Sequence, residues 1–350
     1  MPRRTAVHVE GNEFFVNGEP TYRGRSFRGK KVEGLLLNAR LVQGIFDDLN
    51  PETRGNWDYP DGPWDAQRNT REFVAAMGAW RVAGLIGLTL NLQGGSPRGY
   101  SKEQPWYNSA FTERGELRDA YMARLRQILD RADELGMVVI LGLFYFGQDE
   151  RLADEHAVVR GVDAATDWLL EGGYRNILVE INNECNVARY EHRILTPGWV
   201  DALIQRVRQR SDGRLDTPAG RLLVSTSMGG GAIPSEHIVQ ASDFLLLHGN
   251  GVDSPDGIRD MVRRCRELAA YRGQPILFNE DDHFAFEEPD NHLLAAIDSY
   301  TGWGYFDYRM EGEGFEQGYQ SVPVDWTINS ARKRAFFKVL AEVTGAGAAE

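Results

Sequence analysis

Two glutamates, each closing an apolar segment of the 350-residue chain, are the side chains best placed for chemistry. Glu184 ends the segment 179–184 (VEINNE), and Glu280 ends the segment 275–280 (PILFNE). If both segments are strands of one parallel sheet, their carboxyl ends open on the same edge of that sheet. Two opposed carboxyl groups over a pocket are what the hydrolysis of a glycosidic bond requires.

The elements that must position these carboxyl groups follow a regular alternation of apolar runs and amphipathic segments. Strands are predicted at 22–24, 85–92, 138–146, 177–182, 222–226, 244–248, 276–278 and 303–308. Helices are predicted at about 67–82, 117–135, 200–207, 258–268 and 336–343. Eight strands alternating with helices predict an α/β fold, a single (β/α)8 TIM barrel spanning 1–350. Residues 5–20 predict an N-terminal β-hairpin outside the barrel, and residues 344–350 a loose tail.

Two of the predicted connections between a strand and the next helix are unusually long. They cover 25–65, which contains Trp57 and Trp64, and 91–115, which contains Trp106. In a barrel both loops lie on the face where active sites are built, so the three tryptophans are candidates for contact with substrate. The alternative, that these rings only hold the loops together, is equally open.

Composition excludes several classes of partner. The chain has 39 Lys and Arg against 51 Asp and Glu, a net charge of −12, which argues against nucleic acid or an anionic membrane surface as partner. No apolar run approaches the roughly 20 residues of a membrane helix. The basic N-terminus has no apolar signal segment, which predicts a cytoplasmic protein. No nucleotide, flavin or haem motif is present, and the sequence does not indicate an oligomeric state.

At the two glutamates the pattern resembles the clan of retaining (β/α)8 glycoside hydrolases that includes the family five cellulases and mannanases. That clan has an Asn-Glu pair ending strand four and a single Glu ending strand seven, which correspond here to Asn183-Glu184 and Glu280. The resemblance implies a carbohydrate substrate, no cofactor, Glu184 as acid/base, Glu280 as nucleophile and Asn183 as donor to the sugar 2-hydroxyl. His248, ending strand six, and Trp303, at strand eight, match positions that contact substrate in the clan.

The chain also departs from the family five pattern. Those enzymes usually have an Arg in strand two and two His after strand three, whereas here strand two reads LTLN and strand three ends LFYFG. The Pro that usually follows Asn-Glu is replaced by Cys185. The resemblance therefore does not carry over a particular sugar. From strand-end position alone, Asn91 and Tyr145 are further candidates for contact with substrate.

The chemistry sets expectations for charge and distance. In a retaining mechanism the two carboxyl groups stand about 5–5.5 Å apart. Burial and like charge are expected to raise the pKa of Glu184, while donors around Glu280 keep that carboxylate ionised. Glu180, one step deeper in its strand, is expected to pair with Arg23 or Arg25 inside the barrel.

Three other functions stay open at this point. A metal-dependent barrel hydrolase could use Asp281, Asp282, His283 and His292, although no pair of His follows the first predicted strand. A serine esterase is less favoured because the segment 225–229 (STSMG) lacks the glycine before the nucleophile. A non-catalytic carbohydrate-binding protein would keep the loop tryptophans but would have no need of two opposed glutamates.

Overall fold

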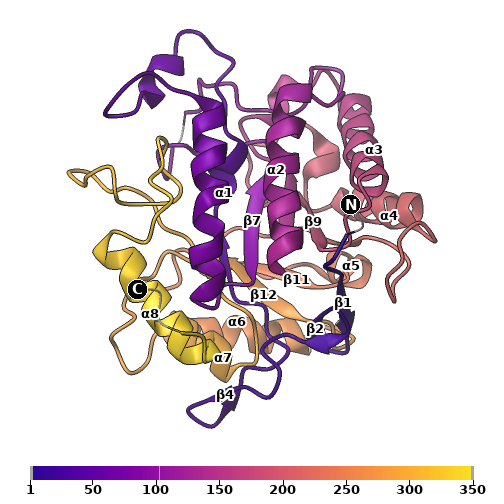
Figure 1. Ribbon diagram of the computed structural model, residues 1–350. Coiled ribbons are helices and arrows are strands. Elements are labelled where there is room, and N and C mark those ends of the chain that lie inside the picture. Colours follow the sequence, from indigo (N-terminus) through magenta and orange to yellow (C-terminus); the bar gives the residue numbers. More distant parts are fainter. Residues whose placement is uncertain (1–2, 102, 348–350) are drawn as a thin grey trace.

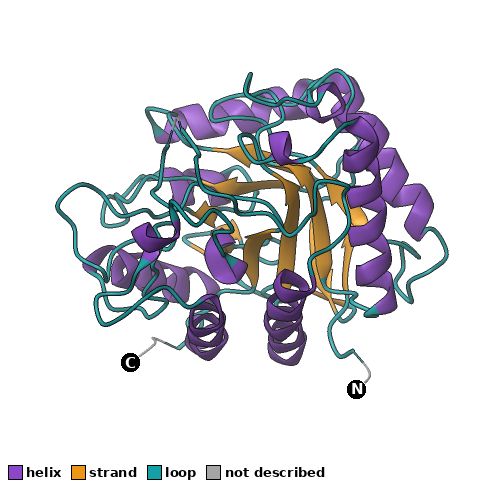
Figure 2. Cartoon of the chain, turned by 90° about the horizontal axis from the view of Figure 1, so that it is seen from above, coloured by secondary structure: helices purple, strands orange, loops and turns teal. Residues whose placement is uncertain are grey.

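Eight parallel strands form the centre of the computed structural model, which describes residues 3–101 and 103–347. In chain order they are β6 (Asn38–Arg40), β7 (Gly87–Asn91), β8 (Val138–Phe144), β9 (Ile177–Asn182), β10 (Leu223–Ser225), β11 (Leu245–His248), β12 (Ile276–Glu280) and β13 (Gly304–Tyr305). One helix follows each strand and covers the outside (Figures 1 and 2). The helices are α1 (Ala66–Val82), α2 (Asp119–Leu135), α3 (Glu155–Glu171), α4 (Val200–Ser211), α5 (Glu236–Ala241), α6 (Pro255–Glu267), α7 (His292–Asp298) and α8 (Ala331–Thr344).

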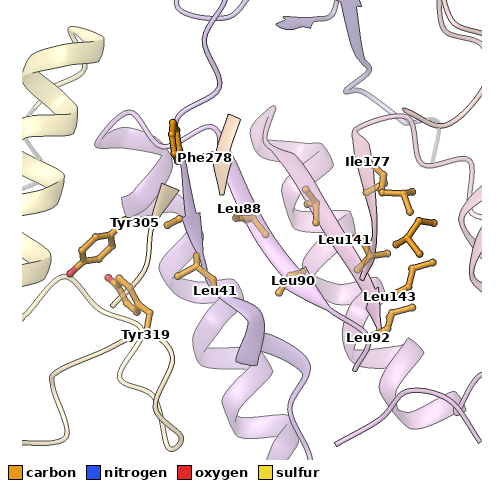
Figure 3. Packing of buried hydrophobic residues seen from close by; sticks show 14 of the residues in the cluster. Leu41, Leu88, Leu90, Leu92, Leu141, Leu143, Ile177, Phe278, Tyr305 and Tyr319 are labelled. Atoms are coloured by element: carbon orange, nitrogen blue, oxygen red, sulfur yellow. The ribbon is translucent and has the colours of Figure 1, made fainter. Parts of the chain in front are cut away.

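The eight strands close into a ring, which confirms the predicted (β/α)8 fold. Six of them form one sheet in the order β10-β9-β8-β7-β6-β13, and β11 pairs with β12. Isolated parallel bridges complete the circle: Ser227 with Leu246 on one side, and Leu277 with Gly302 and Asp281 with Tyr305 on the other. Leucines on the outer face of the strands, such as Leu88 and Leu141, pack in the main buried cluster (Figure 3).

The position predicted for the first barrel strand was wrong. Residues 22–24 form turns, in which Tyr22 has φ 48° and Gly24 φ 72°, values that an extended strand does not adopt. The first barrel strand is β6, which pairs with β7 and β13. The apolar run 35–41 (LLLNARL) contains it, and the inward-facing polar residues Asn38 and Arg40 interrupt that run. The first long loop therefore covers 41–65, and the second covers 92–118.

A small antiparallel sheet packs at the end of the barrel where the strands begin. It consists of β1 (Val7–Glu10), β2 (Glu13–Val16) and β3 (Glu19–Pro20), so the predicted hairpin carries a short third strand. Val7 and Phe14 share a buried cluster with apolar residues at the start of the barrel strands, including Ile140 and Leu277. This end is filled with apolar side chains, and the polar residues lie toward the carboxyl ends of the strands.

Two short hairpin strands, β4 (Ser26–Phe27) and β5 (Lys30–Lys31), lie in the connection before β6. At the other end of the chain, α8 extends to Thr344, and Gly345 follows it with φ 72°. The loose tail predicted for 344–350 therefore begins inside a helix, and its residues 348–350 lie outside the described part of the chain. Among the described residues, no helix is both long enough and apolar enough to cross a membrane.

Candidate active site

Glu280 reaches the mouth of the barrel through an irregularity in β12. Leu247 of β11 pairs with Phe278, but the next residue, His248, pairs with Glu280, so β12 carries one extra residue. Leu277 faces the barrel interior, and simple alternation would then turn Glu280 to the outer face. A bulge of this kind re-aims the side chain that follows it. Glu280 is consequently buried among residues of the mouth, with 5% of its surface exposed.

Glu184 lies two residues beyond the end of β9 in an unusual backbone conformation. Its φ is 51°, in the left-handed region that costs a non-glycine residue about 1–3 kcal/mol. The backbone N–H of Glu184 donates to Ser227 Oγ at 2.9 Å, which helps to hold this conformation. Backbone strain of this kind concentrates at functional sites. The Glu184 side chain is partly exposed, unlike that of Glu280.

His248, at the end of β11, lies between the two glutamates. Its Nδ1 is 2.9 Å from Glu184 Oε1 and 3.6 Å from Glu280 Oε2. A carboxylate oxygen of Glu184 and one of Glu280 lie within 4.8 Å of each other. The structure therefore brings together three predicted site residues that come from three different strand ends.

Arg40 is a fourth member of the site that was not recognised in the sequence. Its Nε is 2.7 Å from Glu280 Oε2, and its Nη2 donates to Asn183 Oδ1 at 2.9 Å. Tyr190 donates its hydroxyl to the backbone carbonyl of Asn183. Arg40 is fully buried, so it places a fixed positive charge beside Glu280 and orients the Asn183 amide. The signal available was a cationic residue inside the apolar run 35–41.

The partners expected for Glu180 were wrong. Arg23 pairs with Glu19, and Arg25 donates to backbone carbonyls at the end of α8, because the segment that carries both arginines lies outside the barrel. Glu180 is buried in the barrel interior, where Asn279 Nδ2 lies 3.5 Å from its Oε2. The charge of Glu180 is among those that raise the pKa of Arg40, which also faces the barrel interior.

Asn250, two residues after β11, is the second site residue that sequence reasoning missed. Its Nδ2 donates to Glu280 Oε1, while Oε2 of the same carboxylate forms the ion pair with Arg40. Four buried polar atoms at the site, Arg40 Nη1, His248 Nε2, Asn250 Oδ1 and Glu280 Oε2, have no hydrogen-bond partner within the described residues. Buried polar atoms are usually satisfied, so these four are free to bind water or the hydroxyl groups of a ligand.

The pKa directions in the free protein are opposite to those expected. Burial disfavours the charged form of Glu184, but the hydrogen bond and charge of His248 outweigh it and hold the pKa of Glu184 below its usual value. Burial raises the pKa of Glu280, whereas the charges of Arg40 and His248 lower it. The effect of burial is larger, so the pKa of Glu280 lies above its usual value. Burial also opposes charge on His248, but the negative charges of Glu280 and Glu184 prevail and raise its pKa. The charge on each of the three groups therefore affects the pKa of the other two.

Tyr145 and Asn91 differ in their distance from this group. Tyr145 follows β8 and is almost fully buried; its pKa is raised by burial and then by the charge of Glu280, which places the ring beside the site. Asn91 ends β7 and lies deeper, against Gly142 and near Glu180. Neither polar atom of the Asn91 amide has a hydrogen-bond partner within the described chain.

The four predicted tryptophans are buried. Trp57 and Trp64 each meet Phe46 edge-on, Trp57 also meets Trp106, and these rings together fasten the two long loops. The indole N–H groups of Trp57 and Trp64 donate to Asp48 and Asp47. Trp303 is fully buried and donates to Asp281 Oδ2 at 2.8 Å. None of the four presents an exposed ring face beside the glutamates.

Asp281, His283 and His292 form a second cluster next to Glu280. The two His Nδ1 atoms lie 2.7 Å and 2.9 Å from different oxygens of Asp281. The imidazole rings are stacked, with centroids 3.8 Å apart and planes at 24°. A nitrogen lone pair lies in the plane of its ring, so two stacked rings cannot both direct a lone pair at one ion about 2.1 Å away. In this arrangement the cluster does not fit a metal.

Comparison with known proteins supports the fold. No protein-family model and no curated protein sequence matches the chain. Among solved structures, an endo-1,4-β-mannanase from Rhizomucor miehei matches with a TM-score of 0.59 and 10% identity, covering 98% of this chain and 100% of that one. A glycoside hydrolase family 5 mannosidase from Rhizomucor miehei matches with a TM-score of 0.56 and 15% identity, covering 98% of both chains.

A xyloglucan-specific endo-β-1,4-glucanase of family 5, from a metagenomic library, matches over 89% of this chain and 96% of its own. Its TM-score is 0.56 and its identity 12%. At such identities the likeness concerns the backbone. The chain shares the (β/α)8 fold of these glycoside hydrolases.

Proposed function

We propose that this chain is a retaining glycoside hydrolase that acts on a small glycoside or an oligosaccharide, with Glu280 as nucleophile and Glu184 as acid/base. The observation that carries the proposal is the convergence of the two carboxylates, with oxygens within 4.8 Å of each other. Inverting enzymes need about 6.5–9.5 Å between their carboxyl groups to admit a water, whereas retaining enzymes have about 5–5.5 Å. The spacing here favours the retaining reaction.

The reaction consists of two displacements at the anomeric carbon. Glu280 attacks that carbon and forms an ester bond, while the bond to the leaving oxygen breaks and that oxygen takes the proton of Glu184. A water then gives its proton to Glu184, and its oxygen displaces Glu280 from the sugar. Asn183, oriented by Arg40, is placed to donate to the 2-hydroxyl as positive charge develops at the ring.

His248 supplies a route for the proton that the first step needs. In the free protein its Nδ1 contacts the ionised Glu184 at 2.9 Å. A bound sugar removes water from Glu184 and so favours the neutral acid over the carboxylate. The proton then passes from Nδ1 to Glu184, which leaves both groups neutral. Arg40 and Asn250 remain on Glu280, where they stabilise the ionised nucleophile.

The proposal is tested with two variants and a panel of α- and β-linked aryl glycosides. Glu280→Ala is expected to abolish turnover on every substrate, because no nucleophile remains. Glu184→Ala is expected to keep turnover of glycosides whose leaving group needs no proton, and added azide should raise the rate by attacking the glycosyl–enzyme ester. Glu191→Ala, which alters an exposed carboxylate beyond β9, serves as the matched control with normal rates.

Three results would count against the assignment. Normal turnover by Glu280→Ala would show that Glu280 is not the nucleophile. Tight sugar binding by the wild-type chain with no hydrolysis of the panel would favour a carbohydrate-binding protein. Loss of activity after exhaustive chelation would support the metal-dependent alternative, which the stacked rings of His283 and His292 do not favour.

A further inference from the structure

Tyr100 is an exposed aromatic residue held in place at the rim of the barrel. It belongs to the loop after β7, and 58% of its surface is exposed. Its hydroxyl donates to Asp282 Oδ2 at 3.0 Å. Its ring meets Phe306 and Tyr308 edge-on, with centroids 5.7 Å and 5.2 Å away. These contacts fix the ring while leaving part of it open to solvent.

The contact between Tyr100 and Asp282 spans three of the eight strand-to-strand steps around the rim. Tyr100 follows β7, Asp282 follows β12, and β6 and β13 lie between these two strands in the ring. The same loop is tied to the segment after β13, because Ser96 and Pro97 carbonyls accept from Gln320 Nε2 and the Val322 N–H at 2.9 Å and 2.8 Å. Protein contacts therefore bound the site along the ends of β12, β13, β6 and β7.

Gly99 shows how closely this loop is seated. It has φ 79°, and a Cβ at this position would lie 2.7 Å from the Tyr308 ring. A larger residue would have to displace the loop. The loop after β7, which carries Tyr100 and forms a wall of the site, thus packs against the end of β13.

The side of the site that these contacts close is the side that would hold the sugar attacked by Glu280. In the proposed reaction the leaving group departs toward Glu184, at β9, so the sugar that forms the ester stays toward Glu280, at β12. The hydroxyl of Tyr100 contacts Asp282, two residues after Glu280, and its pKa is raised by desolvation first and then by the charges of Glu280 and Asp282. A sugar bonded to Glu280 would therefore meet the Tyr100 wall.

We propose that Tyr100 and Asp282 close the site beyond one sugar unit, so that the chain removes single terminal sugars rather than cutting within a polymer. This inference rests on the proposed glycoside hydrolase function. The Tyr100 ring would contact the terminal sugar, and the hydrogen bond to Asp282 would keep a second unit from extending past it.

The test compares aryl glycosides that carry one or two sugar units on the attacked side. The wild-type chain is expected to prefer the one-sugar substrate in kcat/KM by about 100-fold. Tyr100→Ala, which removes the wall, should lower this ratio by at least about tenfold. Tyr100→Phe, which removes only the hydrogen bond to Asp282, should lower it by a smaller factor. Trp199→Ala, which alters an exposed ring on the Glu184 side, should leave the ratio unchanged.

The outcomes separate this inference from the function on which it rests. Three results would refute the inference about Tyr100 without affecting the proposed hydrolase function. They are equal rates on both substrates, release of internal fragments from a five-sugar oligosaccharide, and an unchanged ratio in Tyr100→Ala. If no glycoside is hydrolysed, the proposed function fails, and calorimetric titration with the same sugars decides the role of Tyr100. Weaker binding in Tyr100→Ala but not in Trp199→Ala would support the contact, and equal binding would refute it.

Discussion

Arg40 determines the electrostatics of the candidate site because it is the fixed charge in a buried group of titratable side chains. Glu184, Glu280 and His248 can each gain or lose a proton, whereas a guanidinium keeps its charge. A buried ion pair is costly unless both partners have further hydrogen bonds. Arg40 has one to Asn183 and Glu280 has one from Asn250, so the pair that they form is well supported.

We therefore predict that Arg40 sets the acid limb of the pH–rate profile. Below the folded pKa of Glu280 the nucleophile is protonated, so kcat/KM falls as the pH falls through that value. Replacing Arg40 by Leu removes the cation that lowers this pKa, and the acid limb should move up by about 1–3 pH units. Arg40→Lys keeps the charge and should move the limb less, while losing the bond to Asn183.

The measurement is kcat/KM against pH for the wild type and both variants, with circular dichroism to establish that each is folded. An acid limb in Arg40→Leu that coincides with that of the wild type would show that Arg40 does not act on the nucleophile.

The sequence predicted that Glu184 and Glu280 converge, but it did not predict the residues that surround them. Glu184 and Glu280 were recognisable because each closes an apolar run at a strand end. Arg40 and Asn250 were missed because their roles depend on which strand ends are neighbours in the ring. The burial of Trp57 and Trp303 could not be deduced either, since residue type does not tell whether a ring faces solvent or a loop core.

At the scale of elements, the barrel depends on the closure between its first and last strands. Gly302 bridges Leu277 immediately before β13, and a Cβ there would lie 2.2 Å from the carbonyl oxygen of Leu36. Only a residue without a side chain allows this approach. The chain before β6 and strand β12 thus both pack closely against Gly302, with Arg40 and Glu280 at the ends of β6 and β12.

We predict that Gly302→Ala destabilises the fold by several kcal/mol, on the order of other overpacked core substitutions or more. Gly198→Ala is the matched control, because a Cβ at Gly198 has no atom within 4 Å. Chemical denaturation followed by circular dichroism gives both values. A Gly302→Ala variant as stable as Gly198→Ala would mean that the closure tolerates a side chain.

The alternation of strands and helices was predictable because buried parallel strands form apolar runs. Two features of the elements were not. The three-residue strand β6 carries two polar residues that face inward, so its run lacked the expected pattern. The bulge in β12 inserts Asn279 out of register, and nothing in the segment PILFNE distinguishes a bulged strand from a regular one.

At the scale of the whole molecule, the apolar and polar halves of the barrel have different tasks. The N-terminal sheet and the start of the strands supply a buried apolar cluster, and the carboxyl ends hold the charged group. Two long loops, fastened by buried tryptophans, extend over this second end. The same architecture occurs in the mannanase and the mannosidase that the chain matches in fold.

The most direct test of the central claim is the anomeric configuration of the first product. Proton NMR, recorded while the chain hydrolyses an aryl glycoside, shows which anomer of the product forms before mutarotation. Attack by Glu280 followed by water inverts the carbon twice, so the account predicts a first product with the configuration of the substrate. A first product of the opposite configuration would contradict it, because water would then have attacked directly and Glu280 could not be the nucleophile.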